Sequence, residues 1–203
     1  MKNLLTTCSL ILLLASSLMA TDDKVLNAFK QSYVFENKSE FTKAIAVLKD
    51  VYDENSYEIN LRLGWLCYEA GQFTQSMTYY QNAINLKQYS VEAKLGYVLP
   101  AAAAGNWDQV INQYKKILEY DAQNSLVNYR MGMIYYSRKD YATAQKYFER
   151  VTNLYPFDYD SAVMLGWSYL QMGKMREAKV MFTKSLLIRP DDTSALEGLS
   201  LIK

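Results

Sequence analysis

Large and small apolar residues recur along this chain at a fixed interval of 34 residues. Four series show the interval, and the members of each series have similar size. They are Phe73, Trp107, Tyr141 and Met175; Ser76, Val110, Ala144 and Ala178; Tyr80, Tyr114, Phe148 and Phe182; and Leu63, Tyr97, Met131 and Leu165. Gly64, Gly132 and Gly166 directly follow three members of the last series. A fixed period of this length predicts one supersecondary unit that is repeated and stacked.

Each unit contains two helical stretches separated by a short polar break. In the clearest unit, Met131 and Tyr135 precede the break at 137–140, and Ala144 and Phe148 follow it at helical intervals. The pattern therefore predicts an all-α chain built from helical hairpins.

These residues resemble the tetratricopeptide repeat family, whose pattern runs Leu-Gly, aromatic, Ala, aromatic and Pro. The best matches are Met131-Gly132, Tyr135, Ala144, Phe148 and Pro156, followed by Leu165-Gly166, Tyr169, Ala178, Phe182 and Pro190. Pro156 and Pro190 fit the ends of second helices, because proline cannot continue a helix. The resemblance implies a right-handed superhelical solenoid of about five helix-turn-helix repeats with a C-terminal capping helix.

We expect a signal peptide over residues 1–20 and the solenoid over residues 21–203. The predicted boundaries are a degenerate repeat at about 24–56, full repeats at about 57–90, 91–124, 125–158 and 159–192, and a capping helix at 193–203. The capping helix is expected to cover the apolar end of the stack with Leu196, Leu199 and Ile202.

The leader has the three parts of a bacterial secretory signal: Lys2, the short apolar run 10–15, and a small-residue cleavage site at 17–20. The run is shorter than the 18 to 20 residues or so that span a bilayer, so no span is expected to remain after cleavage. An uncleaved anchor is the alternative. The sequence thus predicts an exported protein, in the periplasm of a Gram-negative envelope.

Composition argues against an enzyme and against nucleic acid. The chain has no histidine, which removes the commonest general base and metal ligand, and it has no phosphate-binding loop or nucleophile elbow. We therefore expect no catalytic residues, no cofactor and no metal. The formal net charge is +1 and falls to zero without Lys2, so nothing favours nucleic acid. Cys67, the single cysteine after the leader, is expected in the core.

The family resemblance sends one face of each first helix into a concave groove. The groove positions in this chain are all apolar or aromatic: Leu61, Trp65, Tyr68, Leu95, Leu99, Ala102, Tyr129, Met133, Tyr136, Val163, Trp167 and Leu170. A contiguous exposed surface of this kind indicates an interaction site. Glu58, Glu92 and Asp160 recur at one edge and would form an acidic rim.

These features predict a non-enzymatic adaptor of the cell envelope that binds an apolar or amphipathic protein segment. Trp65, Tyr129, Tyr136 and Trp167 would be the anchors, and removing the tryptophans should then cost little stability. One alternative is a cell-wall or polysaccharide-binding module that stacks sugars on Trp65, Tyr129 and Trp167. Others are self-association through the groove, or a groove closed by its own repeats.

Overall fold

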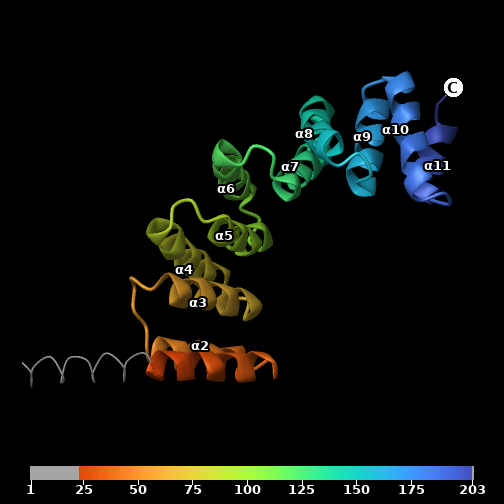
Figure 1. Ribbon diagram of the computed structural model, residues 1–203. Helices are drawn as coiled ribbons and strands as arrows, with labels where there is room; N and C mark the ends of the chain where they lie inside the picture. Colours follow the sequence, from red (N-terminus) through yellow and green to blue (C-terminus); the bar gives the residue numbers. More distant parts are fainter. Residues whose placement is uncertain (1–22, 203) are drawn as a thin grey trace, which may run out of the picture. The chain divides into compact units, whose positions relative to one another are not determined.

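The computed structural model describes residues 23–202, and within this range the chain is all-α, as predicted (Figure 1). The described part contains eleven helices: one over residues 23–36, α2 (Phe41–Lys49), α3 (Tyr57–Glu69), α4 (Phe73–Leu86), α5 (Val91–Ala103), α6 (Trp107–Tyr120), α7 (Ser125–Ser137), α8 (Tyr141–Leu154), α9 (Tyr159–Gln171), α10 (Met175–Ile188) and α11 (Thr193–Ser200). They follow one another as helix pairs and end in a single C-terminal helix. The predicted leader, residues 1–20, lies outside the described residues.

The helices form two compact units, one up to Gln113 and one from Tyr114 onward, so the division falls within α6. The first unit is built around the fully buried Leu48 and Leu63. In the second unit Phe148 and Phe182 are fully buried, each in a hydrophobic cluster. Each unit therefore has apolar packing of its own.

A small polar side chain caps the first helix of each successive pair. The capping oxygen accepts a hydrogen bond from the backbone N–H three residues further on, which satisfies one of the orphan donors of a helix start. The caps are Ser56, Ser90, Asn124, Asp158 and Asp192, with donor to acceptor distances of 3.3, 3.0, 3.0, 2.9 and 2.8 Å. The caps are 34 residues apart, so the period includes the loops as well as the helices.

The turn inside each hairpin is also the same throughout. Its backbone enters the left-handed region at Gly71, Gly105, Lys139 and Gly173, with φ of 72°, 76°, 62° and 73°. After α3 the N–H of Gln72 donates to the carbonyl of Cys67 at 2.8 Å, a Schellman-type closure of the helix. Lys139 makes the same turn without glycine, in a conformation that costs a side chain about 1 kcal/mol.

The second helices pack through an aromatic ring that lies against glycine. The ring of Tyr80 contacts Gly64 on α3 and Gly96 on α5, and the ring of Phe182 contacts Gly166 on α9 and Gly198 on α11. A Cβ added at Gly64 would lie 2.9 Å from the Tyr80 ring, closer than a methyl group can approach. The recurring aromatic residues Tyr80, Tyr114, Phe148 and Phe182 are all buried. Gly96 and Gly198 form the second wall, which the sequence pattern did not predict.

A buried polar side chain ties three of the loops to the helix that follows. Asn60 donates to the carbonyls of Glu54 and Ser56 at 3.0 and 2.8 Å. The Asn128 amide makes the same two bonds, to Ala122 and Asn124 at 3.0 and 2.9 Å. The Lys94 ammonium occupies the equivalent position, is 2 % exposed, and donates to the carbonyls of Gln88 and Ser90. Each of these bonds thus joins the loop at the end of one repeat to the first helix of the next.

The series Phe73, Trp107, Tyr141 and Met175 begins the second helices and lies at the surface or is half-buried; Trp107 is 48 % exposed. The expectation that Leu196 helps to cover the apolar end of the stack is wrong. Leu196 is 48 % exposed, and the buried side chain of α11 is Ala195. Leu199 and Ile202 do pack against the last core cluster, as predicted.

Candidate binding surface on the first helices

The twelve predicted groove residues, here called the first-helix surface, differ widely in exposure. Leu99 and Met133 are the most exposed, at 39 % and 36 %. Val163 is only 6 % exposed and belongs to the core, so its assignment to the groove is wrong. The remaining nine are half-buried: Leu61, Trp65, Tyr68, Leu95, Ala102, Tyr129, Tyr136, Trp167 and Leu170.

Trp65 on α3 is engaged by the helix over residues 23–36. Its indole N–H donates to Glu36, and the other oxygen of that carboxylate accepts from Arg62 at 2.6 Å. Arg62 also donates to Ser32 at 3.2 Å and lies 3.8 Å above the ring of Tyr33. Burial tends to raise the pKa of Glu36, but the bonds from Arg62 and Trp65 outweigh it, so this pKa is lowered. Trp65 therefore links two repeats.

Trp167 on α9 is engaged in the same way by the C-terminal helix. Its indole N–H donates to the Ser194 hydroxyl at 2.8 Å. Its ring packs edge-on against Phe182, with centroids 5.3 Å apart. Both tryptophans thus hold neighbouring helices together, and neither fits the expectation of an anchor whose removal leaves stability intact.

The central first helix, α7, presents its aromatic face differently. Tyr129 leans on the buried Phe148 with centroids 5.9 Å apart, and Tyr136 packs edge-on against Tyr141 at 5.1 Å. Burial raises the pKa of both tyrosine hydroxyls, and the charge of Asp160 raises that of Tyr129 further. Both phenols are therefore neutral at physiological pH. The rings are backed by their own repeat, with Met133 exposed between them.

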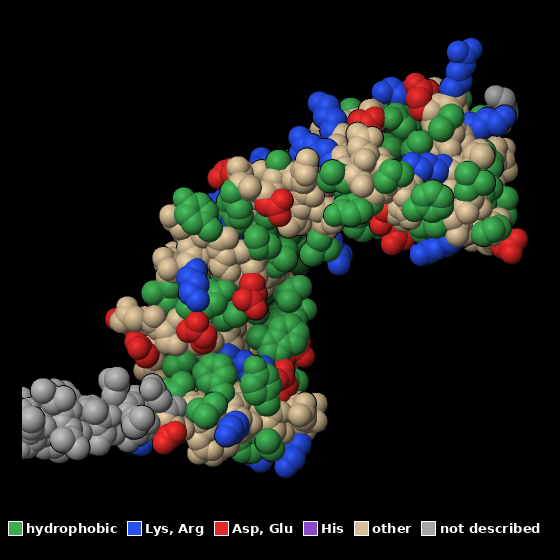
Figure 2. Space-filling view, viewed as in Figure 1, with side chains coloured by type: hydrophobic (Ala, Val, Ile, Leu, Met, Phe, Trp, Pro, Cys, Tyr) green, Lys and Arg blue, Asp and Glu red, His purple; other side chains and the backbone are tan. Residues whose placement is uncertain are grey.

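The residues of the predicted acidic rim have contacts within their own repeat or with the preceding one. Glu58 forms an exposed ion pair with Lys87 at 3.2 Å. Glu92 accepts a hydrogen bond from the Tyr57 hydroxyl at 3.2 Å. Asp160 is exposed and lies near enough to Tyr129 to raise its pKa. On the face drawn in Figure 2, acidic and basic side chains are interspersed among apolar ones.

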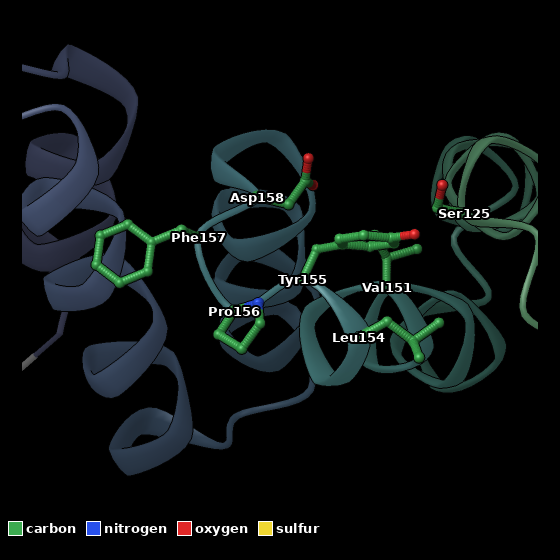
Figure 3. Close-up of a pocket in the computed structure, with 7 residues that line it drawn as sticks. All are labelled: Ser125, Val151, Leu154, Tyr155, Pro156, Phe157 and Asp158. Atoms are coloured by element: carbon green, nitrogen blue, oxygen red, sulfur yellow. The ribbon is translucent and has the colours of Figure 1, made fainter.

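A recess of about 660 Å³ lies in the second unit, between the start of α7 and the connection from α8 to α9 (Figure 3). Ser125, Val151 and Leu154 line it together with the segment 155–158. Sequence reasoning missed this site, because the connection has no hydrophobic period. The signal was present in the aromatic residues 155 and 157, which stand where the other loops carry polar residues or a single tyrosine.

The fold and its first-helix surface define a helical-hairpin repeat protein. Tetratricopeptide repeat models match residues 57–89 and 159–192, and residues 101–163, which together make up more than half of the chain. The chain therefore belongs to the tetratricopeptide repeat family. Proteins of this family generally mediate protein–protein interactions and are typically not enzymes.

Solved structures share the fold at low sequence identity. A tetratricopeptide repeat protein from Parabacteroides merdae is 17 % identical with a TM-score of 0.74, over 88 % of this chain and 72 % of that one. The MamA protein is 19 % identical with a TM-score of 0.72, over 83 % and 93 %. A MamA double mutant, RS-1 ArsTM, is 14 % identical with a TM-score of 0.70, over 85 % and 98 %. No curated protein matches this chain.

Within residues 23–202, no helix has both the length and the apolarity that a bilayer crossing requires. In that same range, there is no cluster of three or more cysteine, aspartate or glutamate side chains that could hold a metal ion.

Proposed function

We propose that this protein is a non-enzymatic scaffold of the bacterial cell envelope that binds an apolar or amphipathic polypeptide segment on its first-helix surface. The observation that carries the proposal is the α7 face, where Tyr129, Met133 and Tyr136 form an accessible apolar row. Large rigid aromatic rings give much contact area at low entropic cost, and they dominate binding energy at many protein interfaces.

The contacts of the two tryptophans change the proposed anchors. Trp65 and Trp167 hold the helix over residues 23–36 and α11, so a ligand that used them would have to displace those helices. We therefore assign the binding energy to the α7 row and, in the first unit, to Leu99. The same contacts weaken the polysaccharide-binding alternative, which needs both tryptophans as exposed stacking platforms.

The affinity test uses a photo-crosslinking amino acid at position 133 to capture the ligand in envelope extracts. Synthetic peptides from the captured protein are then titrated against the wild type and a Tyr129→Ala/Tyr136→Ala variant. The double change should weaken binding at least about tenfold, or 1.4 kcal/mol. Leu187→Ser is the matched control, because Leu187 is 73 % exposed on a second helix. Equal affinities in all three proteins, or tight binding of polysaccharide fragments without peptide binding, would contradict the proposal.

The acidic residues should tune this binding without dominating it. An Asp160→Asn change removes one exposed charge beside Tyr129 and should weaken binding of a basic peptide by less than the tyrosine changes do, because exposed charge pairs contribute little. The loss should shrink as salt is added. A salt-independent loss would mean that Asp160 acts through the fold rather than through its charge.

The location is tested separately. If residues 1–20 are a cleaved leader, the mature protein begins near Thr21 and fractionates with the periplasm. N-terminal sequencing of the protein from fractionated cells measures both. An intact Met1 in the soluble cytoplasmic fraction would remove export from the proposal and leave the peptide-binding part standing.

A further inference from the structure

The loop before each first helix makes the same turn in every repeat, whatever its residues. The N–H of the capping residue donates to the carbonyl three positions earlier in all of them. The pairs are Ser56 to Asp53, Ser90 to Lys87, Asn124 to Asp121, Asp158 to Tyr155 and Asp192 to Arg189, at 3.1, 2.9, 3.1, 3.0 and 3.2 Å. The loop at 189–192 even shares proline and aspartate with the loop at 155–158. The turn therefore does not require aromatic residues at positions 155 and 157.

The loop nevertheless carries aromatic residues at positions 155 and 157, and both are exposed. Phe157 is 75 % exposed and Tyr155 is 55 % exposed. The equivalent residues of the last repeat are Arg189 and Asp191. In Figure 3, Tyr155 extends along Val151 on one side of Pro156, and Phe157 projects to the other side. Exposed apolar surface that folding does not need is typical of an interaction site.

The two loops that border the recess, residues 121–125 and 155–160, carry charges of one sign: Asp121, Asp158 and Asp160, with no lysine or arginine. Arg189, from the loop of the last repeat, lies 3.7 Å from the ring of Tyr159. Arg150, on the neighbouring helix α8, donates to Asn128 at 3.4 Å and lies 5.5 Å from the ring of Tyr147. An apolar recess with a carboxylate border matches a ligand that carries apolar and positively charged groups side by side.

From these contacts we infer that the recess at the connection from α8 to α9 is a second docking site, which adjoins the Asp160 edge of the first-helix surface. Its occupant is a polypeptide segment in which a leucine or aromatic residue is followed closely by arginine or lysine. The apolar side chain lies against Tyr155 and Leu154, and the cation faces Asp158. Anionic lipid does not fit, because the border carboxylates repel its headgroups.

The test uses nuclear magnetic resonance of the full ¹⁵N-labelled chain with three short synthetic peptides. Their central residues are Leu-Arg-Leu, Leu-Glu-Leu and Ser-Arg-Ser, and the ends are blocked. The Leu-Arg-Leu peptide should cause saturable shifts in the backbone amides of Ser125, Leu154, Tyr155 and Asp158. Its affinity should exceed that of each other peptide at least about fivefold, which corresponds to about 1 kcal/mol. Shifts confined to Met133 and Tyr136 would overturn the inference and assign the peptide to the first-helix surface.

Three variants sharpen the test. Phe157→Gln installs the residue that Gln123 provides at the equivalent position of an earlier repeat, so the turn is preserved and affinity should fall at least about fivefold. Asp158→Asn keeps the helix cap, since asparagine caps as well as aspartate, but it should abolish the preference for arginine over glutamate. Tyr89→Ser, at the same loop position two repeats earlier, is the control and should leave affinity unchanged.

Several results would overturn the second site. They are the absence of saturable shifts at 154–158 with millimolar peptide, equal binding of the acidic peptide, and an unchanged affinity in Phe157→Gln. Binding of anionic vesicles at the same amides, without peptide binding, would assign the recess to a membrane surface and likewise overturn the proposal.

Discussion

Helices α3 and α7 stand two periods apart and carry arginine at the same position, yet the two arginines have different environments. Arg62 on α3 is 8 % exposed and is bound by Glu36, Ser32 and Tyr33. Arg130 on α7 is exposed. The helix over residues 23–36 supplies the carboxylate that accounts for the burial of Arg62. The same repeat position is thus surface or interface according to whether a neighbouring helix supplies one polar partner.

The position held by Trp65 on α3 and by Met133 on α7 gives the largest expected difference in stability. Trp65→Ala removes a large ring packed against the first core cluster and leaves Glu36 without one donor, so it should lower the free energy of unfolding by about 3 kcal/mol. Met133→Ala at the equivalent position should cost less than about 1 kcal/mol. Urea unfolding followed by circular dichroism measures both. Equal losses of unfolding free energy in the two variants would mean that α3 and α7 bury this position equally.

The arginines give the next largest difference. Arg62→Met leaves the Glu36 carboxylate without its cation and should cost about 2 kcal/mol, whereas Arg130→Met should change stability by no more than about 0.5 kcal/mol. A Glu36→Gln/Arg62→Met double variant should recover part of the loss, because the uncompensated charge is gone. Additive losses in that double-mutant cycle would show that the pair is not coupled.

The turns that follow α3 and α7 extend the comparison to the backbone. Gly71 and Lys139 share a left-handed conformation, with φ of 72° and 62°. Lys139→Gly should therefore stabilise the protein by about 0.5 to 1 kcal/mol, and Gly71→Ala should destabilise it by about the same amount. No atom lies within 4 Å of a Cβ built at Gly71, so its cost is purely conformational. A destabilising Lys139→Gly or a stabilising Gly71→Ala in thermal unfolding would disprove this account of the turn.

The smallest expected effect is the change in stability at acidic pH. Because the pKa of Glu36 is lowered in the folded protein, its contribution to stability is complete above the reference value of 4.5 and is lost as the pH falls through the folded pKa. Glu36→Gln should therefore be less stable than the wild type at neutral pH, and the gap should narrow as the pH is lowered. Urea unfolding at neutral and acidic pH measures the gap. A gap independent of pH would mean that the lost packing, not the charge, matters.

The fold could be predicted from the sequence because the same pattern of residue types occurs in several repeats. The 34-residue period identified the buried rings of Tyr80, Phe148 and Phe182 and the helix pairs around them. It failed at the surface, since a helical period gives the angle of a side chain about its own axis and not the partner that it meets. The period therefore places Trp65 on the groove face but does not show that its indole N–H meets Glu36.

The 34-residue pattern could not predict the exposed loop residues or the export of the protein, for two different reasons. The exposed Phe157 lies in a turn, where side-chain direction depends on a few backbone dihedrals and not on a period. Export stays a prediction, because it depends on recognition by other proteins and not on the packing of residues 23–202.

The polar side chains Asn60, Lys94 and Asn128 have a consequence for how such a chain grows during evolution. Their bonds reach only four and six residues back and end on backbone carbonyls, so they need no particular side chain in the preceding module. A duplicated module contains its own polar side chain at this position and needs no matching side chain in the module before it. Gene duplication can thus lengthen the array without a matching side-chain change elsewhere.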